Sequence, residues 1–159
     1  MRTAVLRSRR GCTAAALLCA LAACSGDDGK GPVSVTVPPA PAPVERSCSR
    51  LAAQLPASLG EGLDRRATDP QSPLVAAWGN PAVILRCGVT IDEDYSPGDQ
   101  LIHANSEIIG WWQKKSGKTV LWQTPNNTVH VELRVPTSYD GHGGLLAQLS
   151  PLVEAMGPF

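Results

Sequence analysis

A basic segment followed by a short apolar run opens the chain and limits what is left to fold. Four arginines lie within the first ten residues, and an apolar run from Cys12 to Ala23 follows them. A membrane-spanning helix needs about 20 apolar residues, so this run is too short to cross a bilayer. Basic residues before a short apolar run are typical of a cleavable export signal. We therefore expect residues 1–23 to be removed and the fold to come from the remainder.

The apolar run ends in Leu21-Ala22-Ala23-Cys24, which has the form of a bacterial lipoprotein processing site. In such a site the cut precedes the cysteine, and the cysteine thiol receives diacylglycerol. This pattern predicts lipidation of Cys24 and a location at the outer face of the plasma membrane. The alternative is an ordinary secretory cut after an Ala-x-Ala-like site, with Cys24 an incidental thiol. Arg9 and Arg10 leave the choice between Sec and twin-arginine export open.

The charge balance constrains the class of partner. Removal of residues 1–23 leaves ten basic and 14 acidic residues, a net charge of −4. Nucleic-acid binding requires a basic face, so we expect no nucleic-acid partner. Lys114, Lys115 and Lys118 are the one basic cluster, and we interpret them as the charged tip of a hairpin. The expected partners are the membrane, through lipid on Cys24, and an envelope protein or cell-wall component.

The cysteines predict one disulfide. Cys12 and Cys19 leave with the signal and Cys24 carries lipid, so Cys48 and Cys87 remain. Helical spacing places Cys48 on an inward face, and strand alternation does the same for Cys87. In an exported protein we expect these two to be bridged, which the chain-entropy model values at about 4 kcal/mol of stability. A zinc site would need further ligands, and a thioredoxin-like redox pair would be spaced Cys-x-x-Cys.

Composition divides the chain into a signal at 1–23, a tether at 24–46 and one domain at 47–159. Glycine and proline dominate the tether, so we expect an extended segment that reaches at most about 70 Å. The alternative is a poorly ordered terminus whose length has no role. The domain, of about 110 residues, suits a single core.

Hydrophobic periodicity indicates the elements of that domain. We expect an N-terminal helix with Ser47 as its N-cap, a short helix over 72–78 and a C-terminal helix marked by Leu145, Leu149, Leu152, Val153 and Met156. Strands are predicted at 82–87, 101–104, 107–113, 118–124 and 128–135. The predicted fold class is α+β: one small domain with a three- to four-stranded, mainly antiparallel sheet packed with N-terminal helices and a C-terminal helix.

The sequence lacks the motifs of common catalytic and metal sites. It contains no Gly-x-Ser-x-Gly elbow, no His-Glu-x-x-His and no phosphate-cradling glycine loop. The acidic stretch 92–99 fails the EF-hand pattern because Pro97 stands where glycine is required, which favours a solvated loop over a calcium site. His103, His130 and His142 have no metal-ligand spacing, and we expect surface histidines. We therefore predict no catalytic residue, no metal and no cofactor.

Adjacent tryptophans suggest a binding surface. Trp111 and Trp112 follow one another in a predicted strand, so their side chains point to opposite faces. We expect one of the two indoles to be exposed, where it could stack on a sugar or anchor a protein partner. Coverage of both by the C-terminal helix is the alternative.

Several blocks of the chain resemble a known family. They are Arg65-Arg66-Ala67-Thr68, the stretch from Ser72 to Gly88 that contains Ser-Pro-Leu-Val-Ala-Ala-Trp-Gly, the segment from Val129 to Pro136, and Tyr139. Together they resemble the actinobacterial "domain of unknown function" family numbered 3515, over roughly residues 47–155. Members of this family are typically lipoproteins or exported proteins. The resemblance implies no activity, so it supplies no catalytic residue.

Two functions follow as hypotheses. We favour a non-catalytic envelope lipoprotein that binds an envelope protein or cell-wall component. The alternative is an envelope hydrolase or a helper of cell-wall synthesis, with a site near Arg65, Trp78 and Arg86. A purely structural explanation of this block is that Arg86 pairs with Asp69. The candidate binding residues are Arg65, Arg66, Trp78, Arg86, Trp111 and Trp112.

Overall fold

The computed structural model describes residues 31–157. The predicted signal at 1–23, the lipidation site Cys24 and residues 24–30 of the predicted tether lie outside the described residues. Within the described part, neither helix is long and apolar enough to traverse a lipid bilayer.

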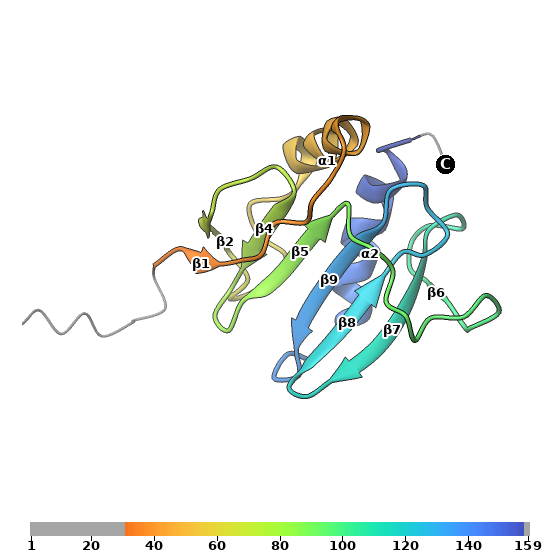
Figure 1. Cartoon of the computed structure of the whole chain (residues 1–159). Helices are drawn as coiled ribbons and strands as arrows, with labels where there is room; N and C mark the ends of the chain where they lie inside the picture. The colour runs from red at the N-terminus through yellow and green to blue at the C-terminus, as the bar shows by residue number, and fades with distance from the viewer. Residues whose placement is uncertain (1–30, 158–159) are drawn as a thin grey trace, which may run out of the picture.

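A seven-stranded sheet in which every strand is antiparallel to its neighbours forms the centre of the described residues (Figure 1). Its order is β2 (Arg65–Arg66), β4 (Val75–Trp78), β5 (Val83–Cys87), β9 (Val131–Pro136), β8 (Thr119–Gln123), β7 (Gly110–Ser116) and β6 (Ile102–His103). A separate parallel pair joins β1 (Val33–Ser34) to β3 (Thr68–Asp69).

Two helices, α1 (Ala42–Gln54) and α2 (His142–Glu154), pack on one face of the main sheet (Figure 1). The apolar stripe predicted for the C-terminal helix is confirmed, since Leu145, Leu149 and Val153 are buried. Pro151 lies inside α2, and its missing N–H leaves the carbonyl of Ala147 without a helical donor. Asn105 Nδ2 donates to that carbonyl at 3.1 Å, so a loop amide restores the missing hydrogen bond.

Strand alternation separates the two faces of the sheet. In β5, Val83, Leu85 and Cys87 are buried toward the helices, and alternate residues of β9 are buried in the same way. Ile84 and Arg86 therefore lie on the opposite face, which we call the open face. These assignments agree with the predicted strands at 82–87 and 128–135.

The predicted disulfide is present between Cys48 and Cys87, with their Cα atoms 5.7 Å apart. It joins α1 to strand β5 of the main sheet. Both cysteines are buried in the core, as their periodicities predicted.

The predicted three- to four-stranded sheet is wrong, because the described residues form seven strands in the main sheet and two more in the parallel pair. The described residues are mostly β, with two helices on one face of the main sheet. The predicted helix at 72–78 is instead β4, which forms a hairpin with β5. Short apolar runs fit either element, and pairing with a neighbouring strand decided this one. The predicted strand at 101–104 contains β6, whereas β2, with only two residues, is too short to show a period and was not predicted.

The turn between β4 and β5 requires a glycine. Gly79 has a φ of 71°, and a Cβ built there would lie 2.6 Å from Leu63 Cδ2 and 2.8 Å from the Tyr139 hydroxyl oxygen. The left-handed backbone and the close packing both exclude a larger residue at this position.

The prediction of Ser47 as the N-cap of the first helix is also wrong, because α1 begins at Ala42 with a proline in its first turn. Upstream, β1 pairs with β3, Pro38 is buried, and Val37 packs against the core. Residues 31–46 therefore belong to the folded domain. Proline-rich composition predicted an extended backbone, and an extended segment can also pack along a sheet. We call residues 31–41 the strap.

Candidate functional site

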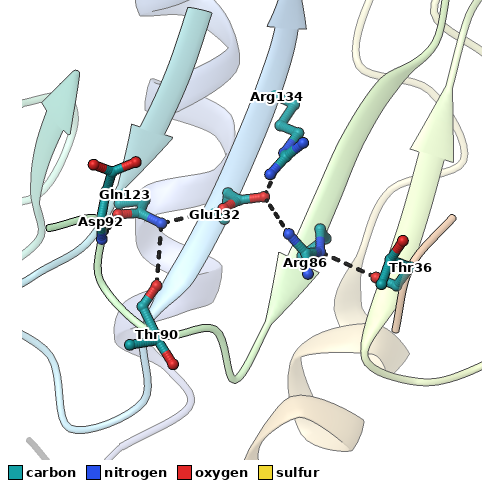
Figure 2. A network of polar contacts seen from close by, with 7 residues as sticks. All are labelled: Thr36, Arg86, Thr90, Asp92, Gln123, Glu132 and Arg134. Atoms are coloured by element: carbon teal, nitrogen blue, oxygen red, sulfur yellow. Dashed lines mark hydrogen bonds and ion pairs between the residues drawn. The ribbon is translucent and has the colours of Figure 1, made fainter. Parts of the chain in front are cut away.

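The open face carries a connected network of polar side chains in place of a second helical layer (Figure 2). At its centre the Glu132 side chain is only 4% exposed. Glu132 Oε1 accepts hydrogen bonds from Arg86 Nη1 at 3.0 Å and Arg134 Nε at 2.6 Å. Its other oxygen, Oε2, accepts from Gln123 Nε2 at 3.1 Å. Both carboxylate oxygens are thus occupied, as burial of a charge requires.

Strand register explains why these residues meet. Arg86 is the partner of Glu132 across β5 and β9, and Gln123 is the partner of Glu132 across β9 and β8. The three residues form one row perpendicular to the strands. In the neighbouring row, Arg134 lies between Ile84 and Leu121. Residues in one row share a face, so the network is set by the register of the three central strands.

Arginines fasten the strap to the rest of the domain at two points. Arg86 Nε donates to the carbonyl of Thr36 at 3.1 Å. Arg66 donates from Nη2 to the carbonyl of Gly31 at 2.6 Å and from Nη1 to the carbonyl of Gly79 at 3.0 Å. The strap therefore crosses the open face at a fixed position, which Figure 1 shows as the orange segment leading to α1.

Three adjoining hollows open on this face, and Arg134 borders all of them. The Arg134 side chain is 48% exposed, so its guanidinium is accessible from these hollows. One hollow of about 340 Å³ lies between the strap and strands β5 and β9, and we call it the strap hollow. A second of about 310 Å³ lies over Glu132 and Gln123. The third, about 200 Å³, lies beside Lys114.

Lys114 pairs with two carboxylates of the acidic loop at 92–99, which follows β5. Its Nζ lies 2.9 Å from Asp92 Oδ1 and 2.6 Å from Asp94 Oδ2. The hydrogen bond from Lys114 and another from the backbone N–H of Asp94 hold the pKa of Asp92 below its ordinary value. Hydrogen bonds to Asp94 and Asp92 raise the pKa of Lys114 to about 12. The structure shows no group of three metal-binding side chains within residues 31–157.

The candidate site near Arg65, Trp78 and Arg86 is not assembled. The Arg65 guanidinium lies 4.7 Å from the Trp78 ring centre, and burial lowers the pKa of Arg65. Trp78 is fully buried and donates its Nε1–H to the carbonyl of Pro56, so its indole is part of the core. Arg86 lies on the opposite face of the sheet from Trp78. The suggested pairing of Arg86 with Asp69 is wrong, because its carboxylate partner is Glu132.

The expectation of one exposed indole at 111–112 is wrong as well. Trp111 is buried against α2, where its Nε1–H donates to Ser150 Oγ at 2.9 Å. Trp112 points to the open face but is also buried, and its ring meets Tyr95 edge-on at 5.8 Å. Helix α2 therefore covers the Trp111 indole on one face of the sheet, and the acidic loop covers the Trp112 indole on the other.

The histidines have different environments. His103 is exposed, as expected, and His130 is half-buried beside the carbonyl of Thr124. His142 is also half-buried, and Trp122 Nε1–H donates to its Nδ1 at 3.3 Å while Nε2 lies 2.9 Å from the carbonyl of Tyr139. Since an indole N–H only donates, Nδ1 is the acceptor and Nε2 carries the proton.

Sequence reasoning missed Glu132, Arg134 and Gln123 as site residues. Alternation did place Glu132 and Arg134 on the polar side of a strand. The missing information was that β9 lies between β5 and β8, which joins Arg86 to Glu132 across 46 positions of the chain.

Comparison with known families now places this domain. The model of the family described as "Protein of unknown function (DUF3515)" matches residues 12–158. The chain belongs to the DUF3515 family. No curated protein and no solved structure matches the chain. The DUF3515 match includes the strap, both helices and every strand described above. It begins upstream of residue 47, within the predicted signal.

Proposed function

We propose that this DUF3515 protein is exported, anchored by lipid on Cys24 at the outer face of the plasma membrane, and acts there as a non-catalytic binding module. Its partner is an envelope protein or a cell-wall component. The observation that supports binding is the open face, on which three hollows adjoin a half-exposed arginine. Concave surfaces with a few fixed polar groups are the usual form of a ligand site.

The fixed strap keeps the proposed module close to the membrane. Gly31 is held by Arg66, and it lies only seven positions after Cys24 in the sequence. A fully extended chain covers at most about 3.6 Å per residue, so this separation is no more than about 25 Å. The open face is therefore available to partners near the lipid headgroups rather than far out in the envelope.

The engagement of the acidic and basic side chains favours binding over hydrolysis. A general base must reach the proton that it abstracts. Both oxygens of Glu132 accept hydrogen bonds, Asp92 pairs with Lys114, and both ring nitrogens of His142 have partners. The residues named for a hydrolase, Arg65 and Arg86, lie on different parts of the sheet, and no observation favours that alternative.

Site-specific photocrosslinking in intact cells tests the binding role. A photoreactive residue replaces exposed Ser116, which borders the hollow beside Lys114. The matched control replaces Ala53, which is exposed on α1. We expect the Ser116 probe, and not the Ala53 probe, to capture a discrete envelope component. Absence of any product from Ser116, or the same products from Ala53, would contradict the proposal.

A further inference from the structure

We propose that the strap hollow binds a phosphate group. This inference rests on the proposed role of the open face as a binding surface and assigns a ligand chemistry to one part of it. The strap hollow is bordered by Ser34, Val35, Thr36, Ile84, Arg86 and Arg134.

The residues that line the strap hollow suit an anion better than those that line the other two hollows. Its border contains two guanidinium groups and two hydroxyl side chains, and none of its bordering residues is acidic. The hollow over Gln123 is bordered by Glu132 and Asp92, and the one beside Lys114 is bordered by Asp92. An anion therefore meets the least repulsion between the strap and β5.

The two arginines retain hydrogen-bond donors. Arg134 uses Nε on Glu132, and Arg86 uses Nη1 on Glu132 and Nε on Thr36. A guanidinium has five N–H groups, so several donors at the two arginines have no partner among residues 31–157. Glu132 balances one of the two positive charges. A net charge of about +1 beside the hollow matches a singly charged phosphate.

The arrangement of the donors favours phosphate over carboxylate. One guanidinium fork is enough to bind a planar carboxylate in a bidentate way. In the strap hollow, the bordering donors come from three elements: the strap, β5 and β9. Donors on several sides suit a tetrahedral oxyanion. Glu132 also holds both guanidinium groups before any ligand arrives, which reduces the entropy lost on binding.

Phosphate can reach this site from two sources. One is the headgroup of an anionic lipid, which the short separation between Cys24 and Gly31 would bring near. The other is a free phosphate or a phosphate of a wall polymer. The recognising chemistry is the same, so one titration tests the site and a second distinguishes the sources.

In the first titration, inorganic phosphate is added to the full chain carrying Cys24→Ser. Binding is measured by calorimetry at low ionic strength. We expect saturable binding that Arg134→Gln weakens roughly tenfold to hundredfold, the value of a charge-assisted hydrogen bond. Arg134 is half-exposed, so this variant is expected to fold. The matched control is Lys115→Gln, which removes the same charge from an exposed position and should change affinity no more than about twofold.

A second pair of variants leaves the arginines intact. Ser34 is exposed on the strap, so Ser34→Glu places a carboxylate at the hollow, and Ser34→Gln is its neutral counterpart. We expect Ser34→Glu to abolish phosphate binding and Ser34→Gln to retain it. Absence of saturable binding would overturn the proposal. So would equal weakening by Lys115→Gln and Arg134→Gln, or by the two Ser34 variants.

The second titration uses vesicles of phosphatidylcholine with and without phosphatidylglycerol. Binding only to the anionic vesicles, competed by inorganic phosphate and lost in Arg134→Gln, assigns the lipid headgroup. Phosphate binding without vesicle binding assigns a free or polymer phosphate. Either result supports the site. If phosphate fails to bind while the Ser116 probe still captures a partner, only the phosphate assignment is overturned and the binding module stands.

Discussion

Glu132 shows how one buried side chain organises the open face. Burial of a carboxylate is costly unless its oxygens are hydrogen-bonded and its charge is balanced. Here Arg86 and Arg134 balance the charge, and Gln123 occupies the remaining oxygen. Gln123 also accepts a hydrogen bond from the backbone N–H of Asp92 at 2.9 Å. The same carboxylate thus links the arginines of the strap hollow to the acidic loop.

We predict that Glu132→Gln lowers the free energy of unfolding by about 1–3 kcal/mol, because it replaces one acceptor with an NH₂ group among donors. Arg134→Gln should cost less than about 1 kcal/mol, since a half-exposed guanidinium is screened by water. Urea denaturation of each variant measures both values. A cost for Arg134→Gln as large as that for Glu132→Gln would contradict this account of the network.

Among the elements, the acidic loop after β5 is stabilised by its pairing with β7. Lys114 projects from β7 and contacts both Asp92 and Asp94, so the loop is fastened to a strand that the sequence separates from it by about 20 positions. Tyr95 in the same loop covers Trp112. The ion pairs with Lys114 therefore hold this loop over the open face.

The ion pairs between Lys114 and the acidic loop stabilise the fold over a defined pH range. The pKa of Asp92 is lowered in the folded chain, so its contribution to stability is complete above its unfolded pKa of about 4 and is lost as the pH falls through the lowered value. The pKa of Lys114 is raised to about 12, so its contribution is complete below about pH 10.4 and is lost as the pH rises through that raised value.

We predict that Lys114→Gln raises the pKa of Asp92 toward its ordinary value, because the largest cause of the lowered pKa is the hydrogen bond from Lys114. Titration of the Asp92 carboxyl by NMR measures the change, with Lys115→Gln as a control of equal charge. The pKa of Asp92 should be unaffected in the control. An unchanged Asp92 pKa in Lys114→Gln would show that the pairing does not persist in solution.

On the scale of the whole molecule, the sheet separates a structural face from a face available to ligands. The helices, the disulfide and most of the apolar core lie on one side. On the other side, one hollow lies between the strap and strands β5 and β9, and another lies between the strap and the acidic loop. The strap leads back toward Cys24, so the proposed anchor enters the domain beside the proposed ligand site.

The anchor carries its own prediction. Cys24→Ser removes the thiol that is proposed to accept diacylglycerol. We expect this variant to move from the membrane fraction to the soluble fraction of exported protein, as detected by immunoblotting. Cys19→Ser makes the same chemical change within the apolar run and should leave the chain membrane-bound. A Cys24→Ser chain that stays wholly in the membrane fraction would refute lipid attachment.

The sequence by itself determined which face of β5 and which side of α2 are buried, although it did not predict the burial of Trp112. Alternation assigned Val83, Leu85 and Cys87 to the core, and the helical stripe did so for α2. The inward positions of Cys48 and Cys87, together with the absence of another available cysteine after the predicted lipidation site, indicated the bridge between them. These features were predictable because a local period reports directly on which side of an element water is excluded. Family membership was also predictable, since it depends on local blocks of residues.

The tertiary structure alone decided which elements become neighbours. The register of β5, β9 and β8 aligns Arg86, Glu132 and Gln123, and the packed strap turns a proline-rich stretch into one wall of a hollow. The two-residue strand β2, which the sequence did not predict, forms by pairing with the edge of β4. Such contacts join residues far apart in the chain, and their energy depends on the assembled sheet rather than on any local pattern.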